Sequence, residues 1–190
     1  KLFKEKLPVI PKTIKKIFDK TLLLPCWDHL NIKLLEAVLI RSGIDARMVP
    51  LTARAIQLGP RTNTGMCIPV NIIIQSLIDY IETNCLDPEQ TAVWVFEANL
   101  ACNIKLFPYF IKSAFESYGN NMEKVSVYLG NLTFKEISYK TTIEVYFAHY
   151  FGGVLRRIGC KIRPYEKKKG ITDKLITQSL SIFYNMFLGN

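Results

Sequence analysis

Short apolar segments alternate with longer segments of helical periodicity along most of the chain, and this alternation limits the possible folds more than any other feature. Four short, mainly apolar segments have the length of buried strands, at residues 21–24, 46–49, 92–96 and 125–129. Strands that alternate with helices are joined by right-handed crossovers and form parallel sheets. The sequence therefore predicts an α/β fold with three layers: a mainly parallel, doubly wound sheet with helices on both faces.

The intervening segments differ in how strongly they predict helices. The expected helices are residues 13–19, a segment capped by Asp28 and ended near Gly43, a segment after Cys67 with Pro69 in its first turn, and residues 104–118. Residues 52–66 contain Gly59, Pro60, Asn63 and Gly65 and are expected to form a loop. The C-terminal part is expected to be mostly helical, with interruptions at Gly152-Gly153, at Gly159 and at Arg163-Pro164.

The size and composition fit one domain of ordinary size. The chain has 190 residues, of which 49% are hydrophobic, enough for a substantial core. Residues 1–20 read as a basic lead-in and residues 21–190 as a single α/β domain with a helical C-terminal region. No apolar run approaches the length of a membrane span, and residues 1–20 lack the features of a secretory signal. A cytoplasmic protein without a membrane partner is expected.

The net charge of +9 is concentrated at the two ends of the chain. The C-terminal cluster comprises Arg156, Arg157, Lys161, Arg163, Lys167, Lys168 and Lys169. Such clusters attract phosphates, nucleotides, coenzyme A, RNA or acidic proteins, although many are only solvated surfaces. The sequence contains no glycine-rich phosphate loop, so no nucleotide and no ATP hydrolysis are expected in this domain. The aromatic residues of 139–151 and 182–187 recur at helical spacing, which favours a core over a nucleic-acid platform.

Three of the five cysteines are predicted to lie at one edge of the sheet. Cys26 follows the first strand, Cys67 begins a helix, and Cys102 follows the third strand. Ligands of open parallel sheets bind at the carboxyl ends of the strands, and three converging thiols suit an iron–sulfur cluster with one open iron. The alternative is that each is a small buried hydrophobic residue. Cys85 is expected at the opposite edge, and Cys160 is not placed.

Several segments match motifs of a known family. They are Leu23–Pro25 (family "LIPNM"), Gly65–Pro69 ("ACYP"), Asp87–Val93 ("YDPDKTAV"), Cys102 ("GGGCR"), and Arg163–Glu166 followed by Gly170 and Thr172 ("RPYE…G.T"). In order and spacing, from about residue 21 to residue 175, the chain resembles the C-terminal cysteine-bearing module of the 2-hydroxyacyl-CoA (2-hydroxyglutaryl-CoA) dehydratase activator-like proteins. These are related to the benzoyl-CoA reductase subunits.

The resemblance implies a function in electron transfer. Members of the family carry iron–sulfur clusters on cysteines at strand ends, and an ATPase activator drives a low-potential electron into the dehydratase component. By this resemblance Cys67 and Cys102 would ligate a four-iron four-sulfur cluster, with Cys26 as the third protein ligand. Arg163 and residues 167–169 would contact the partner or the phosphates of a CoA thioester. The partners would be an ATPase activator, a dehydratase component or other domains of a larger protein, and the module would be inactive as a lyase alone.

The chain also departs from the family pattern. Residues 98–101 replace the glycine-rich turn before Cys102, Asn103 replaces an arginine, and Cys26 stands where the family has no cysteine. These departures favour an alternative, an interaction or scaffold domain of the same fold without a cluster. An RNA-associated basic protein is a third reading, in which binding would weaken steeply with salt. Residues 163–166 also have a structural reading, in which Pro164 stops a helix and Glu166 pairs with a lysine or caps the next turn.

Overall fold

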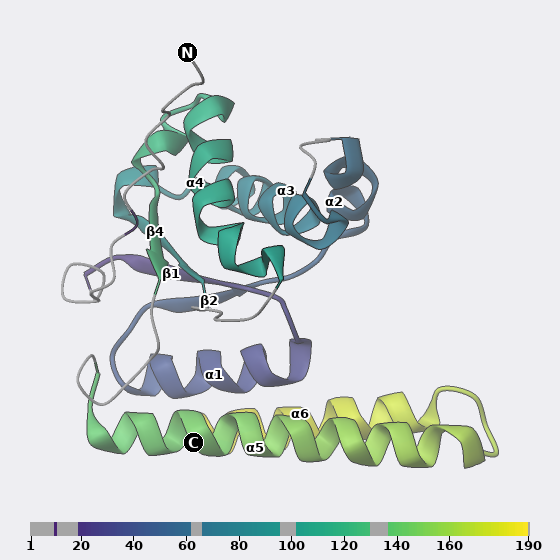
Figure 1. Ribbon diagram of the computed structural model, residues 1–190. Coiled ribbons are helices and arrows are strands. Elements are labelled where there is room, and N and C mark those ends of the chain that lie inside the picture. Colours follow the sequence, from purple (N-terminus) through teal and green to yellow (C-terminus); the bar gives the residue numbers. More distant parts are fainter. Residues whose placement is uncertain (1–9, 11–18, 62–65, 96–101, 130–136, 190) are drawn as a thin grey trace. The chain divides into compact units, whose positions relative to one another are not determined.

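A computed structural model describes residue 10 and residues 19–61, 66–95, 102–129 and 137–189, and it confirms the predicted α/β class (Figure 1). The strands are β1 (Thr21–Pro25), β2 (Ala46–Val49), β3 (Thr91–Val95) and β4 (Ser126–Leu129). They form a parallel sheet with the order β2-β1-β3-β4. Within the sheet, Leu22 lies beside Ala92 and Trp94 lies beside Tyr128. Nearly all residues of β1 and β3 are buried, as expected of parallel strands.

The helices follow the strands in the predicted order. They are α1 (His29–Arg41), α2 (Ala53–Leu58), α3 (Ile68–Thr83), α4 (Phe107–Tyr118), α5 (Tyr139–Ile162) and α6 (Ile171–Leu188). Short 3₁₀ turns are η2 (Gly59–Arg61), η3 (Pro88–Gln90), η4 (Asn103–Leu106), η5 (Met122–Lys124) and η6 (Arg163–Tyr165). As predicted, Asp28 caps α1, because its carboxylate accepts hydrogen bonds from the backbone N–H groups of Leu30 and Asn31. Within the described ranges, no helix is long and apolar enough to cross a membrane.

Two predictions about local structure were wrong. Residues 53–61 are not a loop but α2 and η2, where the Thr52 side chain caps the helix by accepting a hydrogen bond from Ala55 N at 3.1 Å. The glycines at 152, 153 and 159 do not interrupt α5, which runs unbroken over 24 residues. Two of them face close neighbours: a Cβ on Gly152 would overlap Asn31 of α1, and one on Gly159 would touch Ile176 of α6. These positions are small because helices approach there, not because the helix ends.

Other boundaries agree more closely. Gly119, with φ of +88°, follows α4, and Gly43, with φ of +87°, lies just after α1. The segment predicted as one helix over residues 104–118 begins as η4 and continues as α4. Most of the basic lead-in lies outside the described residues, as does the helix expected at 13–19 except for its last residue.

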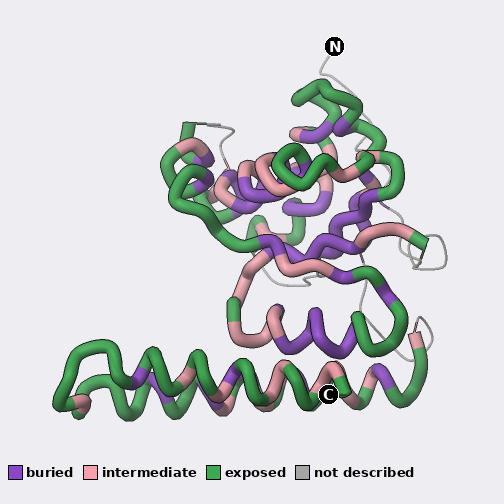
Figure 2. The backbone as a smooth tube through the Cα atoms, turned by 180° about the vertical axis from the view of Figure 1, so that it is seen from behind, coloured by how far each residue is buried: buried purple, intermediate pink, exposed green. Residues whose placement is uncertain are grey.

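The domain predicted over residues 21–190 divides into two compact units. Unit 1 comprises residues 1–25 and 49–131, and unit 2 comprises residues 26–48 and 132–190. In unit 1, α3 packs against β1, α4 packs against β4, and the largest fully buried side chains include Trp94, Phe115 and Tyr128. In unit 2, helices α1, α5 and α6 pack on one another, and along α5 and α6 most residues are exposed (Figure 2). The core of unit 2 contains Leu34, Val38, Ala148, Leu155 and Leu180.

Candidate functional site

Two of the three predicted cysteine ligands lie at the starts of helical segments in unit 1. Cys67 is the N-cap residue of α3, and Cys102 is the N-cap residue of η4, which leads directly into α4. Each helix returns the chain to the start of the next strand, α3 to β3 and α4 to β4. Both helices therefore begin at the carboxyl edge of the sheet, where ligands of open parallel sheets bind.

The two thiols are accessible and do not cap their helices. Cys67 is partly exposed and Cys102 is exposed, and neither makes a side-chain hydrogen bond to its helix N-terminus. The Cys102 thiol donates a long hydrogen bond to the Asn103 Oδ1 atom, at 3.6 Å. The thiolate is the form of cysteine that binds metals. Both residues are chemically suited to ligate a metal.

The other cysteines are placed as follows. Cys26 comes directly after the last residue of β1, is partly buried, and is the first residue of unit 2. Cys85, which was expected at the opposite edge, follows the C-terminal end of α3 and has φ of +50°. Cys160 is exposed on α5. Among the residues that the structure describes, no three or more His, Cys, Asp or Glu side chains are grouped so that they could hold a metal ion. The three-cysteine site stays a prediction, and residues 98–101 before Cys102 lie outside the described ranges.

The predicted anion-binding segment has a local structural role in addition to its charge. Arg163 in η6 forms an ion pair with Asp173 of α6, at 2.5 Å. The Glu166 carboxylate accepts hydrogen bonds from Gly170 N at 2.8 Å and from Thr172 N at 3.0 Å. These two bonds hold the pKa of Glu166 below its ordinary value. Glu166 therefore caps α6, as the structural reading of the sequence predicted, whereas residues 167–169 are exposed.

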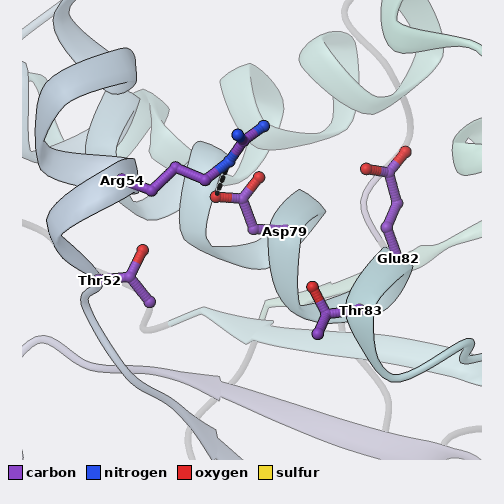
Figure 3. A pocket seen from close by; sticks show the side chains of 5 residues that line it. All are labelled: Thr52, Arg54, Asp79, Glu82 and Thr83. Atoms are coloured by element: carbon purple, nitrogen blue, oxygen red, sulfur yellow. Dashed lines mark hydrogen bonds and ion pairs between the residues drawn. The ribbon is translucent and has the colours of Figure 1, made fainter.

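A polar groove in unit 1 was not expected from the sequence. Its cavity of about 410 Å³ is lined by Thr52, Arg54, Asp79, Glu82 and Thr83, which come from α2 and α3 and the residue before α2 (Figure 3). Asp79 accepts hydrogen bonds from Arg54 Nε at 3.2 Å and from Gln75 Nε2 at 2.8 Å. The only sequence feature that pointed to this groove was the helical spacing of the polar residues 75, 79 and 82, which places them on one side of a helix.

The acidic groups of this groove are already paired within unit 1. Glu82 accepts hydrogen bonds from the Tyr118 hydroxyl at 3.0 Å and from Asn120 Nδ2 at 3.2 Å. Burial, together with the neighbouring Glu82, raises the pKa of Tyr118. Because both carboxylates have protein donors, the groove fastens α2 and the end of α4 to α3 and presents little unpaired charge to a ligand.

Neither family models, nor curated proteins, nor solved structures yielded a match to this chain.

Proposed function

We propose that this chain is an iron–sulfur component module of a system like the 2-hydroxyacyl-CoA dehydratases, with Cys67 and Cys102 as two ligands of its cluster. The observation that carries the proposal is that two accessible, non-capping thiols begin the helices that leave the same edge of the sheet in unit 1. Thiolates at such positions are the usual ligands of iron–sulfur clusters. The resemblance of the segments around both cysteines to the dehydratase activator-like family supports the same assignment.

The donor set in unit 1 fits part of a cluster. Two thiols provide two of the three or four protein ligands that a four-iron cluster requires. When bound, the cluster would supply low-potential electron transfer. The chain itself would hold the thiolates at the sheet edge, and residues 167–169 would offer exposed positive charge to an anionic partner or a CoA phosphate. The ATPase activator and the dehydratase chemistry would belong to partners or to other domains.

The test is the iron and acid-labile sulfide content of the protein after anaerobic reconstitution. We expect about four irons and four sulfides per chain, with broad absorption near ~400 nm. Cys67→Ala and Cys102→Ala should each lose most of the bound iron. Cys85→Ala is the matched control, because Cys85 lies in the same unit at the far end of α3, and it should retain iron. Iron-free wild-type protein, or equal iron in all three variants, would contradict the proposal.

A second candidate function is the interaction domain without a cluster. Large apolar side chains exposed on α5 and α6 favour it, because such surfaces mark binding sites for other proteins. Under this reading the cysteine variants would keep both the stability and the partner binding of the wild type. A cysteine variant that stays folded but loses its partner would rule it out.

A further inference from the structure

Helices α5 and α6 each bury one side in the core of unit 2. Ala148 and Leu155 of α5 and Leu180 of α6 are buried against Leu34 and Val38 of α1. Around this core lie partly buried aromatic residues, among them Phe151, Phe183 and Phe187, and the rings of Phe151 and Phe183 stack with centroids 4.8 Å apart. This packing buries one apolar face of each helix, so the other faces of a surface helix should be polar.

The opposite side of α5 is apolar instead. Tyr139, Ile143, Tyr146 and Tyr150 are exposed, Tyr146 by 70% and Tyr150 by 59%. Tyr146 and Tyr150 stand two residues before and after the buried Ala148, which places them about 200° from it around the helix. The steps between the four residues are 4, 3 and 4, the spacing of the seam of a coiled coil.

The outer side of α6 repeats this pattern. Ile171, Leu175, Ile182 and Met186 are exposed, Ile182 by 61%. Ile182 stands two residues after the buried Leu180, so it also lies on the side away from the core. When Gln178 is included, successive residues of this series are 4, 3, 4 and 4 positions apart. We call the four residues of α5 and these four apolar residues of α6 the outer face.

An apolar groove lies beside the outer face of unit 2. Its cavity of about 340 Å³ is lined by Arg41, Glu144, Phe147, Phe151, Phe183, Met186 and Phe187. Met186 belongs to both the groove and the outer face. Arg41 and Glu144 form an ion pair, with 3.6 Å between Arg41 Nη1 and Glu144 Oε1. A groove of this kind can receive the side chain of a facing helix, as in knobs-into-holes packing.

The extent of the outer face matches a stable protein interface. A large side chain has roughly 200 Å² of surface, and these eight are on average a little over half exposed, so the face presents on the order of 900 Å² of mostly apolar surface. A standard interface buries about 800 Å² per partner. The outer face is therefore large enough to be one half of such an interface.

We propose that the occupant is a second copy of this chain, with α5 and α6 of the two copies packed face to face in a symmetric antiparallel four-helix arrangement. The coiled-coil spacing on both helices fits a helical partner. When the two antiparallel copies of α5 meet at Tyr150, Arg157 and Lys161 of each copy lie near the tyrosines of the other copy. Cation–π contacts are favourable there.

Antiparallel packing also separates the basic ends. The 24 residues of α5 span about 36 Å, so the segments around residues 163–169 lie at opposite ends of the pair, beyond the ~8 Å screening length of physiological salt. A parallel pair would instead place these segments side by side. The proposal is independent of the cluster, because it involves neither Cys67 nor Cys102.

Sedimentation velocity on the cluster-free chain tests the proposal. At about 100 µM, a concentration at which even a Kd in the low micromolar range gives mostly complex, the wild type should sediment with twice the monomer mass of 21.8 kDa. The variant carrying Tyr146→Arg and Ile182→Arg should be a monomer with an unchanged helical circular dichroism spectrum. Tyr165→Arg is the control, since Tyr165 is 85% exposed but lies in η6, outside the outer face, and it should stay dimeric.

Two results would overturn the proposal. The first is a wild type that remains monomeric at this concentration, and the second is a double variant that dimerises as well as the wild type. A monomeric wild type that sediments with anionic phospholipid vesicles would assign the outer face to a membrane surface instead.

Discussion

Gly152→Ala should destabilise unit 2, although alanine is the better helix former. In the interior of a helix, alanine is favoured over glycine by about 1 kcal/mol. At position 152, however, the added Cβ would lie 2.0 Å from Asn31 Oδ1 and 3.2 Å from Asn31 Cα. Rotation of Asn31 would relieve the shorter contact but break its hydrogen bond to Asp28, where Asn31 Nδ2 donates to Oδ2 at 2.9 Å. The backbone contact would remain.

The expected magnitude follows from these opposing effects. Overpacking a close helix contact costs about 1–3 kcal/mol, and losing a hydrogen bond to a charged group costs roughly another 1–2 kcal/mol. After the gain of about 1 kcal/mol in helix propensity, the free energy of unfolding should fall by about 1–4 kcal/mol. The double variant with Asn31→Ala should recover part of this loss, because it removes the clashing oxygen.

The neighbouring glycine provides the control. A Cβ on Gly153 would meet no atom within 4 Å, so Gly153→Ala should raise the free energy of unfolding by up to about 1 kcal/mol. Urea unfolding followed by far-ultraviolet circular dichroism would measure both variants. If Gly152→Ala were as stable as Gly153→Ala, the close approach of α5 to α1 would be refuted.

Two further predictions concern carboxylates of unit 2. Glu36 is only 7% exposed, accepts a hydrogen bond from Met48 N at 2.7 Å and pairs with Lys33. Glu36→Ala should lower the free energy of urea unfolding by about 1–3 kcal/mol, because it leaves the Met48 N–H without its acceptor. Glu36→Gln keeps an acceptor and should lower it less; equal losses in the two variants would contradict this role. The pKa of Glu166 is lowered in the folded chain by the Gly170 and Thr172 N–H groups, so its stabilising effect is present above the unfolded pKa and is lost as the pH falls through the folded pKa. The melting temperature of Glu166→Gln should therefore lie below that of the wild type at neutral pH and approach it as the pH falls through the folded pKa of Glu166. A difference that does not change with pH would refute the capping role.

The sequence predicted the fold well where one local signal dominates. The buried runs of β1 and β3, the Asp28 cap and the start of α3 after Cys67 all follow from hydrophobic runs or capping chemistry that adjacent residues provide. The errors came where a local signal has two meanings. The sequence predicts helix interruptions at Gly152 and Gly159, but their lack of a side chain permits close contacts with α1 and α6 that no local pattern reveals.

The candidate site was predictable only in part, for a similar reason. The alternation of strands and helices, with Pro69 shortly after Cys67, was enough to predict Cys67 and Cys102 at the starts of helices. Whether thiols from separate segments converge depends on tertiary distances that sequence spacing does not determine. The groove around Asp79 and Glu82 was missed because its partners, Arg54 and Tyr118, lie 25 and 36 residues away along the chain.

The segment from Arg163 to Thr172 shows how a family marker can carry structural information without identifying chemistry. Arg163 pairs with Asp173, Pro164 lies where α5 ends, Glu166 caps α6, and Gly170 has φ of +87°, which disfavours any other residue. Arg163, Pro164, Glu166 and Gly170 thus each have a part in turning the chain from α5 into α6. A chain without a cluster would need the same turn, so these residues are explained by the turn alone and say nothing about a cofactor. The functional assignment therefore depends on the cysteines, and the iron content of Cys67→Ala and Cys102→Ala decides between an electron-transfer module and an interaction domain.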